Sequence, residues 1–275
     1  IMKQFRVLLQ TEYQKRRSSY WLPLWIIGGV ALLILLLVLG ALIFSPSNLY
    51  IGSLDGGSAE MRIIAYSLMF SMGLVFFVFM LLMAQSSLNR ERQLLCDDFF
   101  RCQPVSILKT GAAKYLMHVF GGLPLLAACA LVTAVLLSFV MLFSGYGFPF
   151  GAALGGALLG WLVYLKVCLV IGSLVYLFSA IFKSSAFIKG VAAMGILEGT
   201  FALIETVFRH RITLPGIFDT LFSMTGVIFA GDPDPEMLNA AAILGDIRIL
   251  GGVLFAAICY FLGTYIYRQR ANGES

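Results

Sequence analysis

The chain has 275 residues, of which 60% are hydrophobic and only 12% are charged, and its formal net charge is +5. Soluble globular domains carry about 25% charged residues, so the composition excludes an ordinary soluble domain and predicts an integral membrane protein. In such a protein a small positive charge reflects topology and attraction to anionic lipid. It does not indicate a nucleic-acid partner.

Residues 1–20 predict an amphipathic helix that lies in the membrane interface and leads into the first span. The alternative is a soluble tail. Apolar side chains recur at helical spacing opposite polar and basic ones, namely Phe5, Leu8, Leu9 and Tyr13 against Lys3, Gln10, Lys15, Arg16 and Arg17.

Six hydrophobic runs follow, and each predicts a transmembrane helix. About 20 apolar residues suffice to cross a hydrocarbon core of about 30 Å, and lipid favours helices because every backbone polar group must be paired within the segment. The first run is too long for a cleaved signal peptide and is expected to remain as a helix. The predicted fold is one all-α transmembrane domain over residues 1–275, with spans at 21–44, 63–83, 118–143, 152–182, 187–208 and 249–267.

Lysine and arginine placement predicts the orientation. Basic residues concentrate in 1–20, in 86–115, between the fourth and fifth spans, and after the sixth span. Both termini are therefore expected in the cytoplasm, with the protein in the plasma (inner) membrane. Residues 209–248 are expected outside as a re-entrant or interfacial helix pair. A seventh span over 214–230 is the alternative, although that stretch is short for a crossing.

Cysteines and glycines are compatible with this arrangement. Cys129, Cys168 and Cys259 lie in apolar runs, whereas Cys96 and Cys102 lie in a loop on the reducing, cytoplasmic side. All five are expected as free thiols, and no metal site is expected. Glycines at small-xxx-small spacing in the fourth run (151–160) permit close helix approach, either within the subunit or with a second copy.

Three charged residues fall deep inside apolar runs: Lys166 in the fourth, and Glu198 and Glu205 in the fifth. Counting depth from the turn near Ser184 places Lys166 between the two carboxylates. Charged groups at that depth are costly unless they are paired or hydrated. The cluster is expected to be either a structural ion pair between two helices or a hydrated, substrate-facing group.

Catalytic motifs are scarce. The chain has no G-x-x-x-x-G-K-[ST] phosphate loop, and neither of its two histidines accompanies a serine elbow or an H-E-x-x-H helix. No enzymatic activity is expected of this chain.

The dense charged stretch within the cytoplasmic segment 86–115 is a candidate docking surface. It contains Glu91-Arg92, Leu94-Leu95, Phe99-Phe100 and Pro104-Val105-Ser106, and Lys114 follows. This pattern resembles the loop after the second span in the permeases of type-2 ATP-binding-cassette (ABC) exporters. Residues 178–184, Phe-Ser-Ala-Ile-Phe-Lys-Ser, are similar to the family's end of helix four. The family commonly has Gly-Thr after Glu-Arg, and this chain departs from that pattern at residues 93–96.

The resemblance implies a coupling helix that docks on a separate cytoplasmic ATPase. An apolar ridge with a charged rim suits such a contact. The ridge would be Leu95, Phe99 and Phe100, and the rim Glu91, Arg92, Asp97, Asp98 and Arg101, with Pro104 closing the segment.

The resemblance also implies an assembly of two ATPase copies with two permeases, the second being another copy of this chain or a related one. No cofactor is expected in this chain, because ATP and Mg²⁺ would bind the ATPase. Two other functions remain open. One is a non-transporting membrane subunit that transmits ATPase motion to an outer partner. The other is a proton-coupled secondary transporter using Glu198 and Glu205, although no internal repeat of the spans supports it.

Overall fold

The computed structural model describes residues 2–29, 58–89, 106–143, 147–207, 216–225 and 247–273. Within these ranges the chain is helical and has no strand. Five helical segments in the described part are long and apolar enough to cross a membrane. They are Glu60–Ala84, Ile107–Leu142, Phe150–Ile181, Ala186–Val207 and Ile249–Arg270. The prediction of an all-α, multi-pass membrane protein is confirmed at this level.

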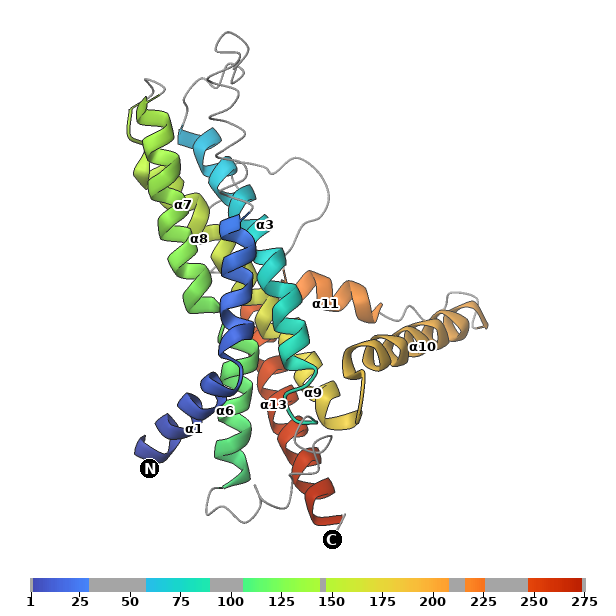
Figure 1. The fold of residues 1–275 in the computed structure, drawn as a ribbon. Coiled ribbons are helices and arrows are strands. Elements are labelled where there is room, and N and C mark those ends of the chain that lie inside the picture. Colours follow the sequence, from blue (N-terminus) through green and yellow to red (C-terminus); the bar gives the residue numbers. More distant parts are fainter. Residues whose placement is uncertain are drawn as a thin grey trace.

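The helices are labelled as in Figure 1. Residues 17–29, which continue from α1 beyond a turn at Arg16, are also helical, whereas residues 30–44 of the expected first span lie outside the described ranges. The bounds are α1 Met2–Lys15, α3 Ser58–Ala84, α6 Ile107–Phe120, α7 Leu123–Phe143, α8 Phe150–Val167, α9 Ser173–Ile181, α10 Ala186–Val207, α11 Ile217–Thr225 and α13 Ile247–Gly273.

The core of the bundle forms where α3, α7 and α8 pack along one another (Figure 1). Two of the predicted small residues make the closest part of this packing possible. A side chain at Gly156 would collide with the backbone of Arg62, and one at Gly160 would lie 2.7 Å from Cβ of Met69. These glycines therefore serve a contact within the subunit, where close backbone approach replaces the hydrophobic effect that lipid does not provide.

One long helix joins this core to the rest of the molecule. From Phe150 to Ile181 the chain is continuously helical, but Cys168–Gly172 form a π-helical turn between α8 and α9. Before this turn the helix packs on α3 and α7, and after it on α13 and α10.

The third span differs from its predicted form. Its helix begins at Ile107, before the predicted start at His118, and breaks at Gly121–Gly122 before α7 continues it. Lys109 and Lys114 lower the hydropathy of this stretch, but Ser106 caps the helix N-terminus by accepting a hydrogen bond from the Lys109 amide. Part of the predicted coupling segment 86–115 therefore belongs to the helical segment Ile107–Leu142, which is long and apolar enough to cross a membrane.

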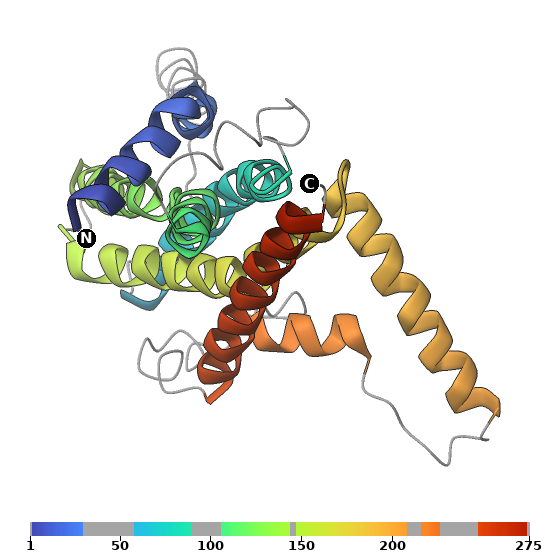
Figure 2. The same cartoon turned by 90° about the horizontal axis from the view of Figure 1, so that it is seen from below.

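Helices α10 and α11 leave the bundle sideways. After the turn at Phe182–Ser185, α10 extends away from α8 instead of returning alongside it (Figures 1 and 2). Helix α11 lies in the expected outer segment 209–248 and contacts α8 and α13. The second helix of the pair predicted in this segment lies outside the described residues, which include only 216–225 between Val207 and Ile247.

Candidate functional site

The residues predicted to contact an ATPase lie outside the described ranges, but both flanks of that segment are described. The undescribed residues are Glu91, Arg92, Leu95, Asp97, Asp98, Phe99, Phe100, Arg101 and Pro104. The chain reaches the segment from Asn89 and leaves it at Ser106. Both flanks lie at the end of the bundle that carries the two termini in Figure 1, called the basal end below.

The first flank is fixed to α9. Ser87 and Ser179 share a hydrogen bond of 2.9 Å between their hydroxyls, and Asn89 Nδ2 donates to the carbonyl of Phe182 at 3.3 Å. Both Ser87 and Asn89 are buried. The chain therefore enters the predicted coupling segment from a point held against the end of a neighbouring helix.

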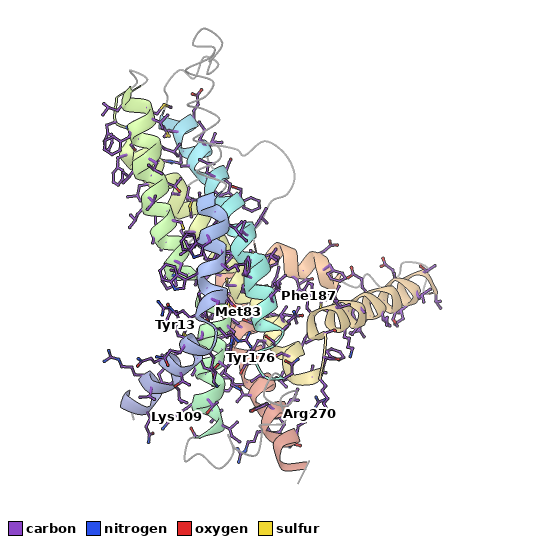
Figure 3. The ribbon with its side chains drawn as sticks, in the orientation of Figure 1. Tyr13, Met83, Lys109, Tyr176, Phe187 and Arg270 are labelled. Atoms are coloured by element: carbon purple, nitrogen blue, oxygen red, sulfur yellow. The ribbon has the colours of Figure 1, made fainter. Side chains whose placement is uncertain are left out.

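Arg270 of α13, labelled in Figure 3, completes this basal layer. The layer consists of Ser87, Asn89, Ser179 and Arg270. Its Nη1 donates to the carbonyls of Ala180 and Ile181, at 2.9 and 2.5 Å. The last carbonyls of a helix have no partner within the helix, and a cation near them is favourable. In the sequence, Arg270 belongs to the basic residues after the sixth predicted span, which indicate topology and do not reveal this contact.

The second flank, α6, is held on three sides. Three tyrosines, of which Tyr176 is buried and Tyr115 and Tyr260 are partly buried, connect it to α9 and α13. Tyr115 shares a 2.6 Å hydrogen bond with Ser173, Tyr176 donates to the carbonyl of Gly111 at 3.2 Å, and Tyr260 donates to the carbonyl of Leu108 at 3.0 Å. Figure 3 shows Tyr176 in this region.

The third side of α6 contacts α1 through a group of buried ionisable residues, the elbow cluster: Glu12, Arg16, Lys114 and His118. His118 Nε2 lies 4.0 Å from Glu12 Oε2. Lys114 is 1% exposed, and its Nζ lies 5.5 Å from the centre of the Tyr267 ring, within reach of a cation–π interaction.

Arg16 was predicted to lie on the polar face of the amphipathic helix. In the structure it is buried instead. It is 9% exposed. Its guanidinium donates to the Ser86 hydroxyl at 2.8 Å and to the Ser86 carbonyl at 3.1 Å. Because Glu12 and Arg16 are four residues apart they share a helix face, and that face points to the bundle. This i, i+4 spacing was the signal that could have revealed the cluster.

Tyr20 connects the elbow cluster to the break between α6 and α7. Its hydroxyl donates to the carbonyl of Met117 at 2.6 Å, and a side chain on Gly121 would lie 2.6 Å from its ring. Burial raises the pKa of Tyr20 above its ordinary range. The phenol therefore stays protonated and keeps its hydrogen bond at physiological pH.

The predicted intramembrane charges occupy separate places. Lys166 is buried near the end of α8. Glu198 instead accepts a hydrogen bond from the Phe218 amide at 3.3 Å, in the first turn of α11, where a carboxylate is favoured. Among the described residues no salt bridge joins Lys166 to Glu198 or Glu205. The predicted pairing requires α10 to run beside α8. Helix α10 instead diverges from α8 (Figures 1 and 2).

The three cysteines inside the described spans, Cys129, Cys168 and Cys259, are free, while Cys96 and Cys102 lie outside the described ranges. Within those ranges no group of three or more His, Cys, Asp or Glu side chains could hold a metal ion.

No family model, curated protein or solved structure matches this chain. In the described part of the chain, the two flanks of residues 90–105 are each hydrogen-bonded to other helices.

Proposed function

We propose that this chain is the permease subunit of an ABC exporter, and that a separate cytoplasmic ATPase docks on residues 89–106. One observation carries the proposal. The charged, aromatic segment with its Glu-Arg and Pro-Val-Ser elements is inserted between two flanks that are each hydrogen-bonded to other helices. A docking segment can move the spans only if its ends are joined firmly to them.

The contacts of α6 support a lever-like role. Helix α6 touches α1, α3, α9 and α13, and its buried polar contacts restrict sliding against them. The break at Gly121–Gly122 then lets α6 change its angle relative to α7 without unwinding either helix. Closure of an ATPase dimer would displace the segment 89–106, and α6 would pass this displacement to α1 and α13.

The distribution of charge supports a cytoplasmic basal end. The N-terminal helix, the start of α6 and the end of α13 lie together there (Figure 1), and they carry much of the chain's lysine and arginine. By the positive-inside rule, both termini face the cytoplasm in a bacterial-type inner membrane. Helix α1 then lies at the membrane surface, and residues 209–248 belong to the outer side.

The proposed complex contains two copies of the ATPase, which bind ATP and Mg²⁺, and a second permease. This chain contributes the spans and the coupling contact and no catalytic residue. Export by alternating access, or by a lateral route from the inner leaflet, is the activity proposed for the pair of permeases.

Replacing Phe99 and Phe100 with alanine tests the proposal. Tagged permease is expressed from its natural genomic context, and co-purification of an ATPase with a Walker motif and the ATPase activity of the preparation are both measured. We expect loss of association, because aromatic anchors dominate such interfaces, while the permease remains monodisperse in detergent.

A matched control removes two exposed phenylalanines far from the segment. Phe139 and Phe148 are 45% and 49% exposed, and their rings lie 5.5 Å apart. The double alanine variant at these positions should associate normally. Equal association and ATPase stimulation by both double variants would reject the coupling assignment.

A further inference from the structure

A groove runs between α6 and α13 on the outside of the bundle, at its basal end. It has a volume of about 370 Å³, within the range of about 300–1,000 Å³ typical of small-molecule sites. Its walls are Ile107 and Leu108 from α6, and Phe261, Leu262, Tyr265 and Arg268 from α13. The buried Thr264 forms its floor.

The groove has its depth because the two helices approach closely at one point. A side chain on Gly111 of α6 would lie 3.0 Å from the Thr264 side chain of α13. The two helices run in opposite directions past this contact (Figure 1). The start of α6 is therefore level with the last turns of α13, and Ile107 lies at the depth of Arg268.

Along α13 the lining changes from apolar to cationic in order of depth. Phe261, Tyr265 and Arg268 are spaced i, i+4 and i+7, which places them on one helix face. At 1.5 Å per residue the stripe is about 10 Å long. Phe261 lies deepest in the span, Tyr265 follows, and Arg268 lies nearest the basal end.

This order matches the profile of a membrane phospholipid. Phe261 and Leu262 are exposed apolar side chains in a membrane span, where acyl chains are their natural neighbours. Tyrosine is enriched at the level of the headgroup boundary. Arginine offers a planar fork of donors that matches a phosphate bidentately, and Arg268 is exposed at the groove's end.

We propose that this groove is a binding site for an anionic phospholipid of the inner leaflet. One acyl chain lies along Leu108, Phe261 and Leu262, and the phosphate contacts Arg268. The site does not depend on the ATPase contact, since it uses a different surface of α6. It would fix a lipid beside the helix that connects the predicted coupling segment to the spans.

The test uses the full chain purified in an uncharged detergent. Native mass spectrometry measures binding of phosphatidylglycerol and of phosphatidylcholine with identical acyl chains. We expect phosphatidylglycerol to bind more tightly. Arg268→Gln should weaken its binding about tenfold, the size expected for one charge-assisted contact, and should leave phosphatidylcholine binding less affected.

Two further variants separate the acyl chain from the headgroup. Leu262→Trp fills the groove and should reduce binding of both lipids. Leu254→Trp is the matched control, because Leu254 is exposed on the same helix and does not line the groove. Arg17→Gln controls for removal of an exposed basal charge. If Arg268→Gln and Leu262→Trp bind phosphatidylglycerol as their controls do, the proposal is overturned.

Discussion

Helices α8 and α10 are both apolar enough to span a membrane, yet the protein uses them differently. The most apolar window of α8 and α9 is 56% buried inside the protein, and that of α10 is 11% buried. Both contain ionisable residues, but only Lys166 on α8 lies in the packed bundle. Hydropathy identifies a helix that can enter lipid, and close contacts with other helices decide which charges it can bury.

The basal end sharpens this comparison, because it buries more charge than the predicted intramembrane cluster does. Glu12, Arg16, Lys114 and His118 are each no more than 9% exposed. Arg16 finds a hydroxyl and a carbonyl partner at Ser86. Glu12 lies 3.0 Å from Lys15 Nζ, and Lys114 lies over the Tyr267 ring. We therefore expect substitutions in this packed region to change the free energy of unfolding more than substitutions in α10 do.

The largest effect is expected from Arg16→Met. The variant loses two hydrogen bonds from a buried guanidinium to the Ser86 hydroxyl and carbonyl, while Glu12 keeps its ion pair with Lys15. Hydrogen bonds to a charged group contribute about 1.5–3 kcal/mol each, so the loss of both costs about 3–5 kcal/mol. The free energy of unfolding in detergent should fall by about this amount. Arg17→Met, which removes an exposed arginine one position further along, should change it by less than about 0.5 kcal/mol, and equal losses in the two variants would contradict a buried role for Arg16.

Two glycine substitutions compare the regions directly. Gly121→Ala places a methyl group against Tyr20 and the Met117 carbonyl, and such overpacking costs about 1–3 kcal/mol. Gly195→Ala on α10 meets no atom within 4 Å and should stabilise the helix by up to about 1 kcal/mol. Thermal unfolding of both variants in one detergent should therefore give shifts of opposite sign. A destabilising Gly195→Ala would mean that α10 is packed against another part of the protein.

Tyr20→Phe should cost about 1 kcal/mol at neutral pH, the net value of one hydrogen bond. In the folded wild-type protein, the pKa of the Tyr20 hydroxyl is raised above its ordinary value of 10.0. The unfolded chain therefore loses this proton first as the pH rises. The stability that Tyr20 contributes is fully present below pH 10 and declines above it, so the difference between wild type and Tyr20→Phe should shrink from pH 9 to pH 11. A constant difference would show that the hydroxyl ionises normally.

The smallest effect is expected in a double-mutant cycle. Lys166→Met and Glu198→Gln should be additive to within about 0.5 kcal/mol, because residues without shared partners rarely couple more strongly. Glu198→Gln alone should cost about 0.5–1 kcal/mol through its contact with the first turn of α11. Rescue of Lys166→Met by Glu198→Gln would instead support the ion pair between Lys166 and Glu198 that was predicted from their depth. It would also mean that α10 lies along α8 in the membrane.

Hydropathy and helix periodicity were sufficient to predict an all-α protein with several helices long and apolar enough to cross a membrane. They could not locate the start of α6, because Lys109 and Lys114 lower the apolar average while the burial of Lys114 depends on Tyr267, far away in the chain. Arg16 was assigned to the polar face of the N-terminal helix because its contact, too, is with a residue far away in the chain. Its partner Ser86 is 70 residues away in sequence, and no local pattern encodes that contact.

The π-helical turn at Cys168–Gly172 has a consequence for evolution by insertion and deletion. A π turn holds about one residue more than an α-helical turn, and one residue corresponds to a rotation of about 100°. The wide turn therefore absorbs one residue that would otherwise rotate the half carrying Tyr176 and Ser179 relative to the half that packs on α3. Deleting one residue here would convert the turn to a regular α-helical turn and leave both side chains facing Gly111 and Ser87. The same deletion elsewhere in α8 or α9 would rotate them away, so this turn is the place in the helix where the loss of one residue is tolerated best.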